Sequence, residues 1–262
     1  MNNTIKNSMC VVATALFSVA TTSAGTVNTP VQATFKSLLD ISGVVSADIV
    51  SGQVYRGVVL DRNPVVQPRL SVSVPLGIDN VTLKASTTET FGAKSPLNGF
   101  VRTENEIGVE VKVGDFTITP SFQTLYSPNS RYESSEGVGV GVQYDDSKFL
   151  GAFALKPRVN AYFTTNGQNG NNQGGQYYEI GIEPSYRSGK NTFSLPVNMG
   201  IGNNNYYAND KSYGYTSVGA VATRALTDRI SLKAGVTYFS TAATVNDKSS
   251  TWSTTGGISY SF

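Results

Sequence analysis

The chain has 262 residues, of which 39% are hydrophobic and 15% charged, and its formal net charge of +2 gives no basis for nucleic-acid binding. It contains no histidine, which removes the usual general base, the usual partner of a serine or cysteine nucleophile, and the commonest metal ligand. We therefore expect a protein that is not an enzyme and that holds neither a cofactor nor a metal.

Residues 1–24 have the layout of a secretory signal peptide. A short polar start with Lys6 precedes an apolar run from Cys10 to about Ala20, and small residues lead up to Ala24. The alternative is a membrane anchor, but the run is well short of the roughly 20 residues that a spanning helix needs. Cleavage after Ala24 would remove the one cysteine and one lysine, leaving 19 basic and 18 acidic side chains and no disulfide.

Residues 25–40 form an N-terminal lead-in, which we expect on the periplasmic side of the membrane. Its second part, "VQATFKSLLD" at 31–40, fits one or two helical turns with Phe35, Leu38 and Leu39 on one side. The alternative is a disordered lead-in, which the polar and small residues around these positions favour.

From residue 41 onward, apolar and polar residues alternate with the period of two that is typical of strands. The stretches "LSVSVPL" at 70–76 and "EIGVEVKV" at 106–113 show the pattern clearly. No apolar block after the signal is long enough to cross a bilayer as a helix, so a membrane protein with this pattern has to be a barrel. With a first strand at 41–56, the alternation predicts about 12 strands.

Short and long connections alternate along the predicted strands. The short ones lie near 77–80, 114–115, 145–148, 187–191 and 226–229. The long ones, rich in Asn, Gly, Ser and charge, lie near 57–66, 92–106, 127–136, 165–176, 202–214 and 241–250. This organisation predicts an all-β fold over 41–262, an up-and-down transmembrane antiparallel β-barrel with short periplasmic turns and longer extracellular loops.

Aromatic residues mark both ends of the outward faces. Those next to the short turns form one predicted girdle at the membrane interface: Phe116, Tyr144, Phe149, Tyr186, Phe193 and Phe262. Those next to the long loops are candidates for a second: Tyr55, Tyr126, Phe163, Tyr178, Tyr238 and Trp252. A soluble periplasmic β-sandwich also alternates, but it needs neither two girdles nor the strict order of short and long connections.

Three prolines fall inside predicted strands, at Pro120, Pro157 and Pro184. Each removes a backbone donor from the ladder, which counts against a closed barrel. If the loop at 165–176 is symmetric, Pro157 and Pro184 lie opposite each other, and we expect a bulge or kink there.

The inward positions carry the charged residues. Those expected in the lumen, where they would set the selectivity for solutes, are Arg56, Arg69, Lys84, Lys112, Lys156, Arg158, Glu179, Glu183 and Lys233. Their positive excess would favour anionic solutes in an open tube. The alternative is that these charges pair and fill a plugged barrel, with Arg158 and Glu183 as cross-strand neighbours.

The two lumen carboxylates are also the only acid/base candidates for an enzyme. Glu179 and Glu183 lie two inward positions apart on one strand face. A role as partners of Lys156 and Arg158 suits them better than catalysis, because the histidine on which barrel hydrolases rely is missing.

The end of the chain, "GGISYSF", resembles the C-terminal signal of bacterial outer-membrane barrels. In that signal a final Phe follows alternating apolar residues, here Ile258, Tyr260 and Phe262. The resemblance implies recognition by the barrel-assembly machinery and insertion into outer-membrane lipid.

A second stretch, "SADIVSGQVYRGVVLDRNPVVQPRLSVSV", is similar to the first hairpin of the TorF-type porins, a family of small outer-membrane proteins. The family typically carries an aromatic-Arg-Gly followed by a Pro and a Gln, which would here be Tyr55, Arg56, Gly57, Pro64 and Gln67. The match covers about 30 residues, and Tyr55 stands where Phe is more usual. No particular solute follows from it.

The sequence therefore predicts a porin or channel of the bacterial outer membrane that lets small polar solutes, with anions among the candidates, diffuse passively. The alternative is a non-conducting structural or surface-binding, adhesin-like barrel. For that alternative, the loop at 202–214 and the residue after it supply Tyr206, Tyr207, Tyr213 and Tyr215.

Overall fold

The protein is described by a computed structural model covering residues 40–92, 100–127, 134–167, 175–203, 206–207, 213–242, 246 and 249–262. The expected signal peptide, and the lead-in up to residue 39, lie outside the described residues. Within the described part of the chain, no helix is long and apolar enough to cross a membrane.

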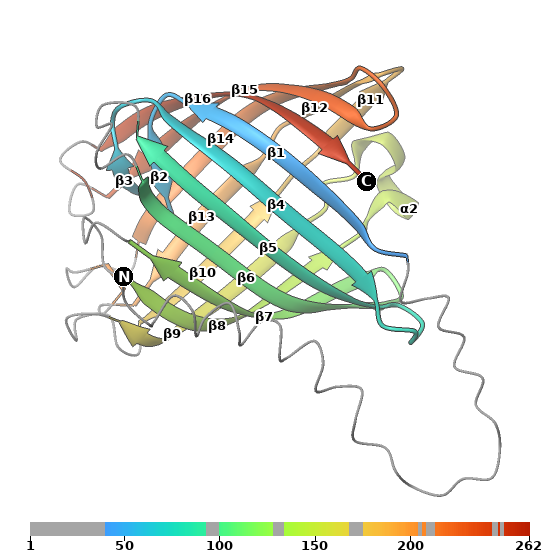
Figure 1. The fold of residues 1–262 in the computed structure, drawn as a ribbon, viewed down its shortest axis with the longest axis horizontal. Coiled ribbons are helices and arrows are strands. Elements are labelled where there is room, and N and C mark those ends of the chain that lie inside the picture. Colours follow the sequence, from blue (N-terminus) through green and yellow to red (C-terminus); the bar gives the residue numbers. More distant parts are fainter. Residues whose placement is uncertain are drawn as a thin grey trace, which may run out of the picture. The chain divides into compact units, whose positions relative to one another are not determined.

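Apart from a separate two-stranded hairpin, the described strands form one closed antiparallel barrel (Figure 1). Neighbours along the chain are neighbours in the sheet, and the first strand pairs with the last from Val44↔Ser261 to Val50↔Thr255. The strands are β1 (Ser42–Val50), β4 (Val65–Pro75), β5 (Val81–Gly92), β6 (Phe100–Val113), β7 (Phe116–Tyr126), β8 (Ser135–Tyr144), β9 (Arg158–Gly167), β10 (Gln176–Ile182), β11 (Ser185–Ser188), β12 (Asn191–Ser194), β13 (Val197–Gly202), β14 (Tyr213–Ala225), β15 (Ile230–Thr241) and β16 (Ser250–Ser261).

Two of the barrel strands are interrupted in the middle. β10 and β11 continue each other across Pro184, and β12 and β13 across Pro196, with the register Ile182↔Val197 resumed at Ser185↔Ser194. Counting each pair as one, the described residues form 12 strands, so the predicted fold is confirmed. The tight turn at Gly114 has a φ of 60°, which glycine adopts at little cost.

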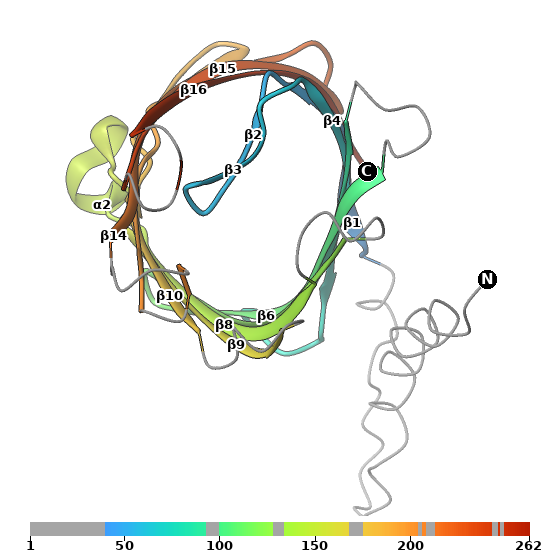
Figure 2. The ribbon, with the colours of Figure 1, turned by 90° about the vertical axis from the view of Figure 1, so that its left-hand side faces the viewer.

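The start of the barrel differs from the prediction. β1 ends at Val50, and a short hairpin follows, formed by β2 (Gln53–Tyr55) and β3 (Val58–Asp61). Figure 2 shows this hairpin inside the ring of strands. The prediction of a first strand to residue 56 and of an outer loop at 57–66 is therefore wrong, because the chain turns into the lumen after Val50.

A second difference lies after β8. The predicted turn at 145–148 and the strand from Phe149 are replaced by α2 (Ser147–Leu150) and η2 (Gly151–Phe153), and β9 begins only at Arg158. The carboxylate of Asp146 accepts hydrogen bonds from the backbone N–H groups of Leu155 and Lys156, both at 3.0 Å, and so closes this segment into a compact loop.

The prolines act in two ways. Pro120 sits opposite Val140 with no register shift between β7 and β8, so the ladder accommodates it without a bulge. Around Pro157 and Pro184 the regular strands do break. The two prolines are not opposite each other: the register Gly181↔Arg158 places Pro157 beside Ile182, and the N–H of Glu183 donates to the carbonyl of Leu155 at 2.7 Å.

The predicted girdle near the short turns lies on the outer surface. Tyr144 packs against Phe116 with their ring centroids 4.9 Å apart, and Tyr186 and Phe193 are 59% and 50% exposed. Phe262 exchanges two backbone hydrogen bonds of 3.0 Å with Gly43, so the final aromatic lies on the seam between the first and last strands. Phe149 is exposed too, but on α2 rather than on a strand.

Candidate functional site

The candidate site is the inside of the barrel, where the β2–β3 hairpin reaches across the lumen. Tyr55 pairs with Val58, and the two residues between them, Arg56 and Gly57, have φ values of 48° and 84°. Two positive φ angles in a two-residue turn are the signature of type I′, whose twist suits a hairpin. The local sequence Arg-Gly thus places Arg56 at the tip.

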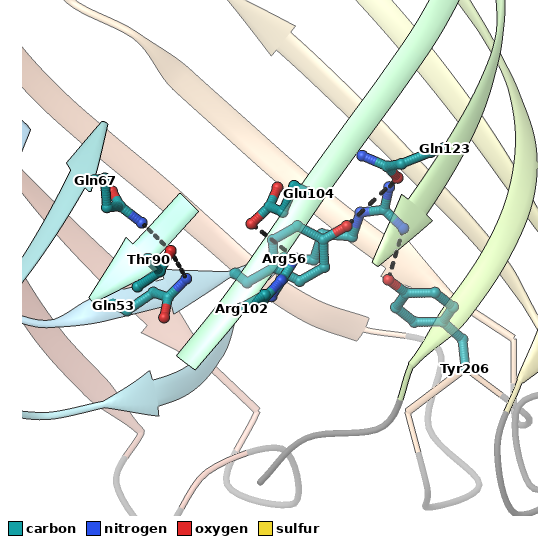
Figure 3. A network of polar contacts seen from close by, with 9 residues as sticks. Gln53, Arg56, Gln67, Thr90, Arg102, Glu104, Gln123 and Tyr206 are labelled. Atoms are coloured by element: carbon teal, nitrogen blue, oxygen red, sulfur yellow. Dashed lines mark hydrogen bonds and ion pairs between the residues drawn. The ribbon is translucent and has the colours of Figure 1, made fainter. Parts of the chain in front are cut away.

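Wall and loop residues hold the hairpin in place (Figure 3). The side chains of Gln53 and Gln67 both donate to the hydroxyl of Thr90, at 3.3 and 3.2 Å. Asn246 binds the turn and the second strand of the hairpin: its amide oxygen accepts from the N–H of Val59 at 2.8 Å, and its amide nitrogen donates to the Gly57 carbonyl at 2.7 Å.

The guanidinium of Arg56 is held by neutral groups. It donates to the hydroxyl of Tyr206 at 2.9 Å and to the amide oxygen of Gln123 at 2.6 Å. It also lies over the rings of Tyr162 at 4.0 Å and Tyr177 at 4.7 Å, in the geometry of cation–π contacts. Among the described residues no carboxylate forms an ion pair with Arg56, so its positive charge faces the lumen without a direct counter-charge.

A second arginine lies beside the hairpin. Arg102 on β6 stacks over the ring of Tyr55 at 3.6 Å and forms an ion pair with Glu104 at 2.8 Å. Neither Arg102 nor Glu104 is among the residues predicted from the sequence, because both fall within the long loop expected at 92–106. The sequence pattern assigns Tyr55 to a girdle, but Tyr55 lies in the lumen, so that prediction is wrong.

Tyrosines fill the space around the hairpin tip. Tyr177, Tyr207 and Tyr215 are 1%, 4% and 5% exposed and form the buried cluster of the described chain. The hydroxyl of Tyr207 donates to the carbonyl of Arg56 at 2.9 Å. Of the four tyrosines expected to serve surface binding, Tyr213 is exposed at 39%, whereas Tyr207 and Tyr215 are buried and Tyr206 packs against this cluster.

Glu179 is a carboxylate bound to this cluster. One of its oxygens accepts hydrogen bonds from the hydroxyls of Tyr177 at 2.7 Å and Tyr215 at 2.6 Å. Its partners are therefore tyrosines, and not Lys156 or Arg158 as the sequence suggested. These two hydrogen bonds orient the rings of Tyr177 and Tyr215.

The other lumen charges are mostly paired across strands. Lys84 and Lys112 both reach Glu110, and Arg158 meets Glu183 at 3.2 Å and Asn198 at 2.7 Å. The ion pair of Arg158 and Glu183 agrees with the expected neighbourhood of these two residues. These pairs fix side chains along the wall.

Three further predicted lumen residues have different settings. Lys233 on β15 meets Asp48 on β1 at 2.7 Å, across the seam strand β16. Arg69 donates to the hydroxyl of Ser71 at 3.2 Å. Lys156 belongs to the loop closed by Asp146, where its backbone has a φ of 49°, so it stands apart from the middle of the tube.

A cavity of about 180 Å³ opens next to these pairs, on the inner face of β6 to β9. Its lining is polar and of mixed charge: Glu106, Glu110, Thr117, Thr119, Ser121, Gly141, Val142, Gln143, Arg158, Asn160 and Tyr162. Tyr162 belongs to both the cavity and the hairpin site, since the guanidinium of Arg56 lies over its ring. Within the described ranges there is no cluster of three acidic or cysteine side chains fit for a metal ion.

Comparisons with known proteins identify the fold. No protein-family model matches the chain, and no curated protein matches it. Many solved structures are similar to it, and two of them illustrate the likeness. The NanC porin superposes with a TM-score of 0.52 at 17% identity, covering 83% of this chain and 98% of its own. An outer membrane channel from Pseudomonas putida F1 superposes with a TM-score of 0.57 at 12% identity, covering 85% and 95%. At such identities the likeness shows the fold alone, that of bacterial outer-membrane barrels.

Proposed function

We propose that the protein is a narrow outer-membrane channel through which small polar solutes diffuse, with anions preferred, and that the β2–β3 hairpin forms its constriction. The observation that carries the proposal is the position of Arg56. A hairpin tip inside the lumen presents a guanidinium whose contacts in the described structure are neutral. In a narrow tube with low-dielectric walls, such a charge attracts anions and repels cations.

The remaining lumen charges support a modest preference. Most carboxylates are matched by a neighbouring cation, as in the pairs of Glu110, Glu183 and Asp48. Glu106 lines the cavity and lowers the positive excess there. We therefore expect selectivity to depend on the hairpin tip more than on Arg158, and Lys156 to have little effect because it lies in the loop after β8.

The resemblance to TorF-type porins supports the same assignment. The residues that carry it, Tyr55, Arg56 and Gly57, form the turn of the hairpin. We propose on this basis that the chain is a member of that group, exported by its signal peptide and assembled through the C-terminal pattern that ends at Phe262. The proposal includes no enzymatic role, and the hydrogen-bonded states of Glu179 and Glu183 suit structural work in the wall.

Planar-bilayer recording of the refolded barrel tests the proposal. We expect discrete channels with greater anion than cation permeability, and a drop in this ratio in the variant Arg56→Gln. The matched control is Arg224→Gln, which removes the same charge from the outer face of β14, where Arg224 pairs with the exposed Leu232. A properly folded barrel without any ion current would refute the channel, and an unchanged ratio in Arg56→Gln would refute the role of the hairpin tip.

A further inference from the structure

The segment between β8 and β9 leaves the barrel wall. Residues 147–155, here called the rim segment, comprise α2, η2 and the two residues after them. Figure 2 shows α2 outside the ring of strands, and Figure 1 shows it at the end of the barrel where the C-terminus lies. The segment is thus neither part of the sheet nor part of the lumen.

The rim segment exposes large apolar side chains. Phe149 and Phe153 are 76% and 81% exposed, against 48% for Phe116 and 50% for Phe193, which lie on the outer faces of strands at the same rim. Leu150 and Leu155 are exposed as well. Four such side chains in nine residues form an apolar patch larger than isolated surface hydrophobics explain.

Polar contacts hold the rim segment against the barrel on its other side. Asp146 binds the backbone N–H groups at its end, Lys148 forms an ion pair with Asp115 in the turn before β7, and the carbonyl of Leu155 accepts from the N–H of Glu183. The apolar side chains therefore stay directed outward in a defined position. An amphipathic element of this kind fits the interface between headgroups and acyl chains.

We propose that the rim segment is a membrane-interface anchor, with Phe149 and Phe153 inserted into the acyl-chain region of the leaflet at the short-turn rim. Lipid is the occupant that the structure favours because the patch is continuous with the lipid-facing girdle. The segment starts just after Tyr144, whose ring packs on Phe116, and its η2 part contacts β11, which carries the exposed Tyr186. The inference depends on the barrel fold and not on conduction.

Depth-dependent fluorescence quenching tests the anchor. The chain has one tryptophan, so Trp252→Phe provides a background in which Phe153→Trp reports on the rim segment alone. In vesicles of phosphatidylcholine brominated near the headgroup end of the chains, we expect several-fold quenching and blue-shifted emission. Two controls bracket the result: Phe193→Trp on the lipid face of β12, and Asp228→Trp in the exposed turn between β14 and β15.

Quenching of Phe153→Trp close to that of Phe193→Trp supports the anchor. If Phe153→Trp shows the emission and the acrylamide quenching of Asp228→Trp, the anchor is refuted, and the patch is covered by water or by a protein instead of lipid. Because Phe153 is the more exposed of the two rings, its replacement should leave the fold intact. If that variant does not show the heat-modifiable migration of a folded barrel, Phe149→Trp gives the same two readings.

Discussion

Replacing Gly57 by alanine should release the hairpin from the lumen. Gly57 has a φ of 84°, and a Cβ built on it would lie 2.6 Å from the Cδ1 and 2.8 Å from the Cβ of Tyr215. Tyr215 has little room to yield, since it is 5% exposed and its hydroxyl is bound to Glu179. The left-handed backbone costs about 1–2 kcal/mol for a residue with a Cβ. Overpacking against the ring adds about 1–3 kcal/mol.

These costs act on the docked hairpin, because an undocked hairpin can relax both. A loss of about 2 kcal/mol or more shifts the docked-to-undocked ratio by about 30-fold or more, at 1.4 kcal/mol for each factor of ten. We expect Gly57→Ala to show a longer time in a high-conductance state in single-channel recordings, together with weaker anion preference. We expect the 12-stranded barrel of Gly57→Ala to stay folded, because the hairpin shares no backbone pairing with the barrel sheet.

Gly114→Ala is the matched control for this prediction. Gly114 also has a positive φ, of 60°, but no atom lies within 4 Å of the position that a Cβ would take, and it sits in the short turn between β6 and β7. Gly114→Ala therefore has the same unfavourable backbone conformation as Gly57→Ala, but it causes no collision and lies away from the hairpin. If Gly57→Ala folds and its conductance levels equal those of the unmodified protein and of Gly114→Ala, the hairpin does not limit the passage and the reasoning is wrong.

Further predictions concern the seam and the rim. Gly257→Ala places a Cβ against the carboxylate of Asp48, so we expect its ion pair with Lys233 to break and the unfolding temperature in detergent to drop, whereas an unchanged temperature would assign no role to this pair. Gly43→Val occupies the position of the Phe262 ring, and slower insertion into vesicles is expected. Backbone N–H groups, chiefly that of Lys156, hold the pKa of Asp146 below its usual range, so its stabilisation is present above about pH 4 and is lost as the pH falls further; emission of the Phe153→Trp variant should report this loosening in acid.

Alternation was sufficient to predict the barrel because it reflects a constraint that every strand shares. In a transmembrane barrel one face of each strand meets lipid and the other meets the lumen, and the period of two that this requires recurs here from Ser42 to Ser261. Arg158 and Glu183 were predicted as neighbours from a symmetric loop at 165–176. The register is different, with Gly181 opposite Arg158, but alternation places Glu183 on the same face as Gly181, and the two charged side chains still meet. Strand ends are harder to predict, since β6 begins at Phe100 inside an expected loop.

The hairpin could not be predicted because alternation does not report where a strand leaves the wall. Tyr55 has the parity of an outward residue on a continued first strand, yet the bend after Val50 carries it into the lumen. The rim segment was missed for a related reason. Phe149 and Phe153 are four residues apart, a spacing that suits a strand of period two and a helical turn equally well. The hydrogen bonds from the N–H groups of Leu155 and Lys156 to the Asp146 carboxylate close this segment into a loop. Such contacts cannot be read from the alternation of apolar and polar residues.

The contacts that hold the hairpin differ in kind from those that hold the barrel. Backbone hydrogen bonds to both neighbouring strands close the wall. In a membrane these bonds are obligatory, because the hydrocarbon offers backbone N–H and C=O groups no other partner. The hairpin is held by side-chain hydrogen bonds and by the rings around Arg56. A neutral hydrogen bond, such as that from Asn246 to the Gly57 carbonyl, contributes only about 0.5–1.5 kcal/mol, and one donated by the charged Arg56 about 1.5–3 kcal/mol, because lumen water can replace each of them. A constriction built in this way can move while the barrel stays intact. An anion that binds Arg56 would compete with the contacts that hold the hairpin in the lumen. Anion binding should therefore favour opening of the hairpin, and we expect the conductance to rise more steeply than in proportion to the anion concentration.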